Sequence, residues 1–211
     1  GCKASVVKDY VVSPLIPWDG VSIAKSFNSG SGTSEDPYVI ASAAQLAYLA
    51  KQVNDGNAFE STSFKLLNDI NLNYHSLMIG SNSAPFKGTF DGDNHIIKHL
   101  SISASDTYCG LFPYLDGSVK NLGIIKSSIT STSSDNNSYV GTIAYASTSS
   151  TIENCYYSGK ISASGAVNTY VGALIGYSDG TVSHCYSIGN ITAKTTNYVY
   201  AGGLVGYSSG S

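Results

Sequence analysis

The feature that most constrains this chain is a repeat in its C-terminal half. The segment YVGALIGY at 170–177 recurs as YAGGLVGY at 200–207 and, less closely, as YVGTIAY at 139–145 and YCGLFPY at 108–114. The closing tyrosines are 31, 32 and 30 residues apart, at Tyr114, Tyr145, Tyr177 and Tyr207. A period of this size is typical of a solenoid, in which each repeat buries its apolar face only against its neighbours.

A second pattern repeats across the same region and begins earlier. It has the form apolar, two polar, apolar, any, apolar, and it occurs at 67–72, 97–102, 119–124, 152–157 and 182–187. Superposing the copies predicts two inward columns: Leu67, Ile97, Val119, Ile152 and Val182, then Ile70, Leu100, Leu122, Cys155 and Cys185. The two polar residues fit a corner, and the alternation that follows fits a strand. The crossover rule favours a right-handed coil. The predicted fold is therefore an all-β, right-handed parallel β-helix.

One helix is predicted, ahead of the solenoid. Ser42 and Gln45 form a capping-box pattern, apolar residues follow at helical spacing, and Gly56 stands where the helix should end. Such an amphipathic helix would cap the open first coil. We therefore expect a tether at 1–17, a cap at 18–58 with a loop, a short strand at 38–40 and a helix at 43–54, and a β-helix at 59–211.

Composition excludes some partners. Charged residues make up only 12% of the 211 residues, and every basic residue is a lysine. Arginine is the favoured residue for recognising phosphates and bases, so we expect no nucleic-acid partner. No apolar run is long enough to span a bilayer.

Cys2 stands near the start of the sequence, before a polar, proline-containing segment. A cysteine there is typical of a bacterial lipoprotein whose signal peptide has been removed. We therefore expect lipid attachment at Cys2, contact with the membrane through this anchor only, and a place on the outer membrane. The alternative is an incidental exposed thiol.

The repeats also carry a family resemblance. The copies at 172–177 and 202–207 resemble the GLUG motif of bacterial cell-surface proteins, and the steps at 154–156 and 184–186 resemble the Asn-Cys-Tyr step that follows it. Segments at 36–40, 45–50 and 86–92 resemble the N-terminal part of the same proteins. The copy at 141–145 departs from the motif because it has no second glycine. The resemblance implies a β-helix on the cell surface, since members are described mainly as adhesins or surface proteins.

Two motifs that could indicate catalysis have simpler explanations. Gly-x-Ser-x-Gly occurs at 176–180 and 206–210, but a nucleophile elbow needs a following helix, and here the motif sits at a repeated turn. His95 and His99 lie in an apparent strand, where four residues span about 13 Å, so they cannot share a metal ion. We expect neither a metal nor a cofactor.

The remaining candidates for catalysis are three aspartates and a histidine. Asp69 and His99 would lie on adjacent coils as a proton-transfer pair; the alternative, which we favour, is a polar corner ladder with Asn121, Asn154 and His184. Asp91 and Asp93 could form a glycosidase carboxylate pair or a loose calcium site. Both flank Gly92 in a strong turn sequence, and we favour the turn.

Cys155 and Cys185 are 30 residues apart in one column, so they should face each other across neighbouring coils. Such a separation permits a disulfide. Free cysteine also packs as a small apolar residue, and we favour a ladder of buried thiols.

Tyrosines are the strongest binding signal. If Cys155 and Cys185 point inward, alternation turns Tyr156 and Tyr186 outward on adjacent coils. Stacked there, they would offer an amphipathic platform for a sugar or a protein surface. The alternative is that these rings only shield the coil.

Three functions follow from these patterns. The first is an adhesion or ligand-binding scaffold that presents a tyrosine-rich face to a glycan or a host or matrix protein. The second is a carbohydrate-active enzyme (a glycosidase or lyase) that uses Asp69, Asp91, Asp93 and His99. The third is a stalk for a downstream domain. The sequence stops inside a repeat, so we expect a further coil or another subunit to cover the end at Ser211.

Overall fold

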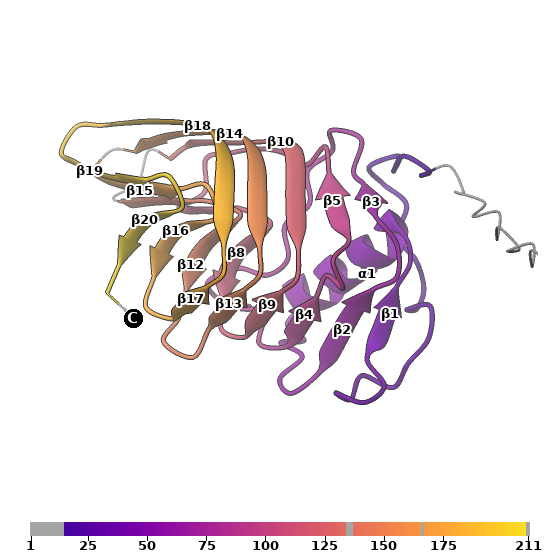
Figure 1. The fold of residues 1–211 in the computed structure, drawn as a ribbon. Helices are drawn as coiled ribbons and strands as arrows, with labels where there is room; N and C mark the ends of the chain where they lie inside the picture. Colours follow the sequence, from indigo (N-terminus) through magenta and orange to yellow (C-terminus); the bar gives the residue numbers. More distant parts are fainter. Residues whose placement is uncertain (1–14, 134–136, 166, 210–211) are drawn as a thin grey trace, which may run out of the picture.

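The computed structural model describes residues 15–133, 137–165 and 167–209, and this part of the chain forms a parallel β-solenoid of about six turns (Figure 1). Successive turns stack their strands into four sheets, and every strand pairing is parallel. The predicted β-helix is confirmed. Cys2 and the rest of the first 14 residues lie outside the described residues, as does Ser211.

Two of the sheets run the length of the solenoid. The first consists of β1 (Tyr38–Ile40), β2 (Ser63–Leu66), β4 (Thr89–Asp91), β9 (Ser118–Lys120), β13 (Thr151–Glu153) and β17 (Thr181–Ser183). The second consists of β3 (Ile70–Asn71), β5 (Ile96–Lys98), β10 (Gly123–Thr132), β14 (Tyr156–Gly165) and β18 (Tyr186–Thr195), with β6 (Ser101–Ala104) also paired to β10.

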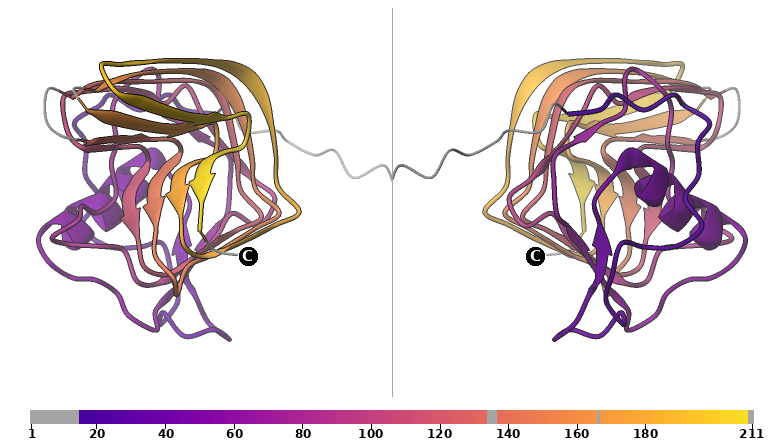
Figure 2. Two further views of the ribbon diagram at one scale, coloured as in Figure 1. Left: turned by 90° about the vertical axis from the view of Figure 1, so that its left-hand side faces the viewer. Right: turned by 90° about the vertical axis from the view of Figure 1, so that its right-hand side faces the viewer.

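The other two sheets occur only in the later coils. One consists of β7 (Tyr108–Cys109), β11 (Asn137–Val140), β15 (Asn168–Gly172) and β19 (Tyr198–Gly202). Its partner consists of β8 (Phe112–Leu115), β12 (Ile143–Ala146), β16 (Ile175–Ser178) and β20 (Val205–Ser208). Seen along the solenoid axis, these sheets meet at an inside corner of the cross-section (Figure 2, left).

The repeat period equals one coil. Tyr139 pairs with Tyr108 on one side and Tyr170 on the other. The closing tyrosines pair in the same way across β8, β12, β16 and β20. Each copy of the tyrosine–glycine segment therefore stacks directly on the previous copy.

The predicted inward columns are correct only in the later coils. In the first column, Val119, Ile152 and Val182 do pair. Leu67 and Ile97 do not belong to it, because Phe64 and Phe90 occupy those places and the Leu67 side chain is 50% exposed. Coils in the first half have unequal lengths, so the same apolar pattern recurs there out of phase.

The second predicted column is also correct in the later coils and wrong in the early ones. Leu122, Cys155 and Cys185 each precede residues that pair with one another in β10, β14 and β18. Ile70 pairs instead with Ile97, so it does not lie above Leu122. Leu100 accepts a backbone hydrogen bond from Ser128, which places it beside the Ser127 bulge instead.

The single helix of the described residues, α1 (Ala43–Asn54), has the predicted bounds. The Ser42 side chain accepts a hydrogen bond from the Gln45 amide N–H, and the Gln45 side chain accepts one from Ala41. Its buried face consists of Ala43, Leu46, Ala47, Leu49, Ala50 and Val53. The helix lies across the N-terminal end of the solenoid and covers its core (Figure 2, right). No helix among the described residues is long and apolar enough to cross a membrane.

Glycines of the repeat let the two shorter sheets approach closely. A Cβ on Gly172 would lie 2.1 Å from the carbonyl oxygen of Ile175. A Cβ on Gly176 would lie 2.7 Å from the backbone nitrogen of Val140 on the facing sheet. Side chains at these positions would push the sheets apart. The glycines thus set the angle at which the flanking tyrosines meet.

Candidate functional site

The largest cluster of aromatic side chains outside the core of the described residues follows the line where the two shorter sheets meet. Seven of its eight members are half-buried, and the eighth, Tyr207, is 38% exposed. We call it the tyrosine array. One column comes from β7, β11, β15 and β19, and the other from β8, β12, β16 and β20. Its members are Tyr108, Tyr139, Tyr170 and Tyr200 in the first column, and Tyr114, Tyr145, Tyr177 and Tyr207 in the second.

Within each column the rings stack face to face. In the first column the ring centroids are 4.9, 4.8 and 4.7 Å apart, with planes within 9° of parallel. In the second they are 4.7, 5.0 and 5.1 Å apart, at 18°, 5° and 23°. Each inner ring therefore has both faces covered by its neighbours. The array presents ring edges and hydroxyls at the surface rather than open ring faces.

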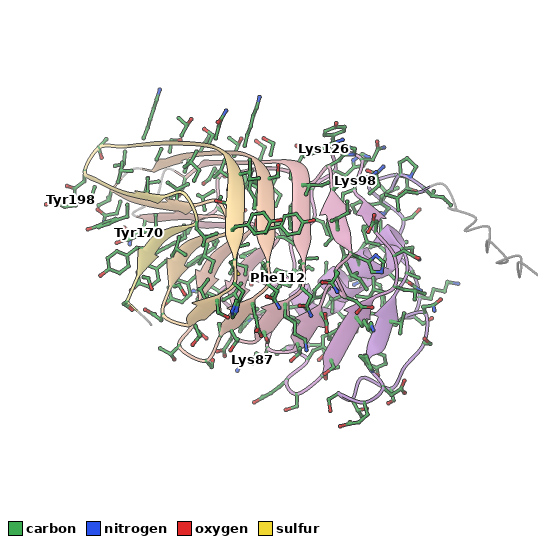
Figure 3. All side chains as sticks on the ribbon, in the orientation of Figure 1. Lys87, Lys98, Phe112, Lys126, Tyr170 and Tyr198 are labelled. Atoms are coloured by element: carbon green, nitrogen blue, oxygen red, sulfur yellow. The ribbon has the colours of Figure 1, made fainter. Side chains whose placement is uncertain are left out.

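The two columns also contact each other edge to face. Tyr139 meets Tyr145 at 5.9 Å and 85°, and Tyr170 meets Tyr177 at 5.5 Å and 75°. Aromatic pairs of this kind contribute about 0.5–1.5 kcal/mol beyond their buried area. The rings interlock, so they form a surface that is ordered before any ligand arrives. Figure 3 labels Tyr170 on this outer surface and Phe112, which is fully buried, in the core.

A line of hydroxyls and carboxylates runs beside the second column. The Tyr145 hydroxyl donates to Asp179 Oδ2 at 2.6 Å, and Ser209 donates to the other oxygen of this carboxylate. Burial opposes the ionisation of Asp179, but the hydrogen bonds from Ser209 and the tyrosines outweigh it and lower its pKa. Asp179 therefore fixes the direction of the Tyr145 hydroxyl.

Burial keeps four tyrosines of the array uncharged at neutral pH. Burial raises the pKa of Tyr108, Tyr139 and Tyr170 above the ordinary tyrosine value. The pKa of Tyr145 is raised most, first by burial and then by its hydrogen bond to Asp179. All four hydroxyls keep their protons. The Tyr145 proton is donated to Asp179, and the other three hydroxyls can donate a hydrogen bond to another group.

Tyr156 and Tyr186 lie on another face of the solenoid, and the structure places them as predicted. They pair in register, with centroids 5.0 Å apart and planes 3° from parallel. Tyr186 is 54% exposed. Gly123, in register with Tyr156, leaves the space for its ring, since a Cβ there would lie 2.3 Å from the ring. The Tyr156 ring thus lies between Gly123 and the Tyr186 ring, and the more open face of the pair belongs to Tyr186.

The predicted adjacency of Asp69 and His99 is wrong. Asp69 Oδ1 lies 3.1 Å from His95 Nδ1, whereas His99 Nδ1 lies 3.0 Å from Asn71 Oδ1. His99 also stacks on Tyr74 at 4.6 Å, and burial lowers its pKa. The prediction failed because the early coils differ in length, so residues at equivalent places in the sequence pattern do not stack on one another.

The polar corner ladder exists, but its members differ from the prediction. Asn94, Asn121, Asn154 and His184 all have positive φ angles, between 51° and 66°, and occupy one corner. Asn154 donates to Asn121 through its side chain at 3.1 Å. Asn94, and not Asp69 or His99, continues this ladder into the earlier coils, because Asn94 N–H donates to the Asn121 carbonyl.

Asp91 and Asp93 form the predicted turn. Asp91 Oδ1 accepts hydrogen bonds from the Asp93 backbone N–H at 2.8 Å and from the Asn121 side chain at 3.0 Å. Burial opposes the ionisation of Asp91, but these bonds and Lys120 lower its pKa. Asp93 pairs with Lys65 at 2.9 Å. Asp69, Asp91, Asp93 and His99 thus have separate partners and do not converge on one reacting position.

The cysteines of the inward column are free thiols, as favoured from the sequence. The hydrogen bond with Cys185 and then burial raise the pKa of Cys155. Cys155 backbone N–H donates to Cys185 Sγ at 3.4 Å. The first of the two Gly-x-Ser-x-Gly motifs is a turn and not a catalytic site. Its serine, Ser178, is fully buried and donates a hydrogen bond to the Gly180 carbonyl at 3.3 Å. Among the described residues, no three His, Cys, Asp or Glu side chains are grouped so as to hold a metal ion.

The tyrosine array was not predicted from the sequence as a candidate site, although its tyrosines define the repeat. The signal was present: each repeat carries a tyrosine at both ends, so stacking must produce two parallel columns. What the sequence did not show is that a tight glycine turn folds the columns against each other.

Comparisons with known proteins agree with this architecture. Residues 167–192 match the family described as the GLUG motif. The chain is 30% identical over 133 residues to Halomucin from Haloquadratum walsbyi, an overlap of 59% of this chain and 1% of that protein. It is 29% identical over 131 residues to the "Putative Gly-rich membrane protein" of Evansella cellulosilytica, 57% of this chain and 15% of that protein.

Among solved structures, a chain described as a "putative immunoglobulin A1 protease" from Bacteroides ovatus is similar, with a TM-score of 0.58 and 22% identity over 86% of this chain and 65% of that one. At this identity the likeness shows the fold alone. The chain carries a GLUG motif and resembles GLUG-motif surface proteins, so the predicted resemblance is confirmed. It spans only small parts of the curated relatives, 1% and 15% of their lengths.

Proposed function

We propose that this protein is a cell-surface scaffold for adhesion or ligand binding, and that the tyrosine array is its principal binding surface. The observation that carries the proposal is the array itself: eight interlocked tyrosines on the outside of the solenoid. Tyrosine is enriched at the centre of binding surfaces because it offers large contact area at a small cost in side-chain entropy. Rings already held by one another lose little further freedom on binding.

The orientation of the rings favours an elongated, oxygen-rich ligand. The edge of an aromatic ring carries partial positive charge, and the array turns its edges and hydroxyls outward. Equivalent hydroxyls recur at each coil along the solenoid axis, because the rings stack at 4.7–5.1 Å. A linear glycan that lies along the axis could accept and donate hydrogen bonds coil after coil. Tyr156 and Tyr186 form a second, smaller contact surface in this proposal.

The surface location is part of the proposal. Its support is the resemblance to proteins named as a halomucin and a membrane protein. Acylation of Cys2 would hold the solenoid at the outer membrane and leave the array free to meet host or matrix glycans and proteins.

The direct test is a screen of the protein on arrays of glycans and matrix proteins. The variant Tyr170→Phe/Tyr177→Phe removes two hydroxyls from the middle of the array and keeps the rings. A matched control is Tyr74→Phe, because Tyr74 is 65% exposed and stacks on His99 in the N-terminal half. We expect selective glycan binding that the double variant weakens and the control retains.

Four other outcomes would each change this proposal. Loss of binding in Tyr156→Ala/Tyr186→Ala alone would move the site to the smaller surface. Selective binding of a matrix protein through the array would keep the surface and replace the ligand class. Cleavage of a bound glycan would favour the carbohydrate-active enzyme, and no binding by the intact protein would contradict the proposal.

A further inference from the structure

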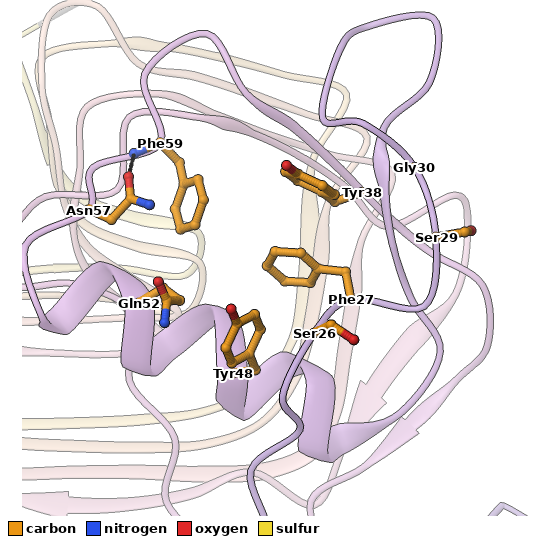
Figure 4. Close-up of a pocket in the computed structure, with 9 residues that line it drawn as sticks. All are labelled: Ser26, Phe27, Ser29, Gly30, Tyr38, Tyr48, Gln52, Asn57 and Phe59. Atoms are coloured by element: carbon orange, nitrogen blue, oxygen red, sulfur yellow. Dashed lines mark hydrogen bonds between the residues drawn. The ribbon is translucent and has the colours of Figure 1, made fainter.

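The N-terminal cap contains a pocket that is separate from both tyrosine surfaces. Its volume is about 400 Å³, toward the small end of the range of about 300–1,000 Å³ that is typical of ligand pockets. Four aromatic rings and two amides line it: Phe27, Tyr38, Tyr48, Phe59, Gln52 and Asn57 (Figure 4). We call it the cap pocket. Tyr48 and Gln52 come from α1, whereas the other four belong to the segments around it.

The aromatic walls are held in place by the core. Phe27 packs against Tyr38 at 4.8 Å and Tyr48 at 5.1 Å, and its ring also meets the buried Phe64 at 5.3 Å. Behind Tyr38, Gly32 has φ +86°, and a Cβ there would lie 2.5 Å from the Tyr38 ring. The loop therefore fits closely around this tyrosine. The pocket is formed before any ligand binds, which reduces the ordering that binding requires.

Phe59 adds an unusual backbone. Its φ is +54°, a left-handed conformation that a bulky side chain rarely adopts. The Asn57 side chain accepts a hydrogen bond from the Phe59 N–H at 3.2 Å, and the Phe59 ring packs on Phe64 at 5.0 Å and 86°. Strained backbone persists where surrounding contacts enforce it, and such positions cluster at ligand sites. Here the strained residue supplies one wall of the pocket.

The polar groups of the cap pocket are all neutral and several are unused. No charged side chain is among the described residues that line it. Within the described part of the chain, the hydroxyls of Tyr38 and Tyr48 and the side-chain amide of Gln52 have no hydrogen-bond partner. Amides and hydroxyls can donate and accept, so they suit a ligand that carries several hydroxyls. The aromatic rings suit the apolar face of the same ligand.

We propose that the cap pocket binds one neutral sugar residue. A pyranose ring combines a C–H face, which packs on aromatic rings, with hydroxyls around its edge that reach amides. The neutral lining disfavours an acidic sugar, whose carboxylate would lose its hydration without gaining a cation. The volume of about 400 Å³ is sufficient for a single ring or the end of a longer chain. This site does not depend on the tyrosine array.

The test is a nuclear magnetic resonance titration of isotope-labelled protein. The probes are the methyl glycosides of glucose, galactose, mannose and N-acetylglucosamine, beside glucuronate and the N-acetyl amides of leucine and phenylalanine. We expect at least one neutral glycoside to bind saturably, with shifts confined to 26–30, 38 and 48–59. Tyr48→Ala should weaken binding at least about tenfold, the loss expected when about 1.4 kcal/mol of contact is removed.

A second variant keeps the test valid if Tyr48→Ala perturbs the cap. Gln52→Ala changes a partly exposed helix position and should weaken binding about threefold or more, whereas Lys51→Ala, one residue earlier on α1, should leave it unchanged. Tyr170→Phe/Tyr177→Phe should also leave it unchanged, which separates this site from the array. No saturable glycoside binding, tighter binding of glucuronate, or preference for an amino-acid amide would each overturn the proposal.

Discussion

The two halves of the solenoid use aromatic residues in opposite ways. All six phenylalanines lie at or before residue 112, and four of them are fully buried: Phe64, Phe86, Phe90 and Phe112. Twelve of the sixteen tyrosines lie between 108 and 207, and most of these are on the outside. A phenyl ring can be buried freely, whereas a buried hydroxyl needs a partner. The first half therefore has a thick aromatic core, and the second has a thin aliphatic core with aromatic rings outside.

The sharpest test of this contrast is to remove one ring from each half. Phe90→Ala should lower the free energy of unfolding by about 3–5 kcal/mol, because it leaves a cavity between Phe112 and the strands around it. Tyr177→Ala, in the array, should cost about 1–2 kcal/mol, since water can fill the space. Chemical denaturation measures both, and equal losses would contradict the division of roles.

The glycine corner that brings the tyrosine columns together is the next target. Gly172→Ala should destabilise by about 1–3 kcal/mol, because the new methyl group meets backbone atoms that cannot move aside. Gly203 lies in a later copy of the repeat, where an added Cβ would have no atom within 4 Å, so Gly203→Ala should change stability by less than about 0.5 kcal/mol. A tolerated Gly172→Ala would show that the corner is looser than described.

In the second half, removing a buried tyrosine hydroxyl should destabilise the protein more than removing one at the surface. Tyr157 is the exception to the outward tyrosines: it is buried, and its hydroxyl bonds the carbonyl oxygens of Ser127 and Lys160 at 3.1 and 3.0 Å. Tyr157→Phe should cost about 1–3 kcal/mol, because the buried Ser127 carbonyl loses its donor. Tyr170→Phe should cost less than about 0.5 kcal/mol. Thermal unfolding of the two variants measures both losses. A smaller loss for Tyr157→Phe than for Tyr170→Phe would show that water already reaches the Tyr157 hydroxyl.

The smallest expected effect is a change in how the free energy of unfolding depends on pH under alkaline conditions. The pKa of Tyr145 is raised, so the folded state holds this proton more tightly than the unfolded state does. Its contribution to stability is complete below the ordinary tyrosine pKa of about 10 and is lost as pH rises toward the folded-state pKa. Tyr145→Phe should therefore flatten the loss of stability above pH 10. An unchanged alkaline profile would show that Tyr145 is not buried against Asp179.

The same contrast explains how far the sequence predicts the structure. In the second half every coil has nearly the same length, so Val119, Ile152 and Val182 could be placed in one column from their spacing alone. In the first half the coils differ in length, and the pattern placed Leu67 in the core although it is half exposed. A local apolar pattern does not determine register when the turns between strands vary.

The sites show a similar limit. Outward stacking of Tyr156 and Tyr186 followed from alternation within a strand, which is a local property. The tyrosine array depends on contact between two sheets, and the cap pocket on three separate segments around α1. The tyrosine columns do repeat at a fixed spacing, but the contact between them depends on the turn that joins the two sheets. The cap pocket does not repeat, so neither site could be derived before the coils were in place.

The most direct test of the central claim is to measure glycan affinity while hydroxyls are removed along the array one coil at a time. Tyr139→Phe, Tyr170→Phe and Tyr200→Phe, singly and together, change ligand contacts but not ring stacking. If an elongated ligand lies along the axis, each removal should weaken binding by several-fold and the losses should accumulate from coil to coil, while Tyr74→Phe has no effect. Affinity that stays constant in the triple variant would show that the array is not the binding surface.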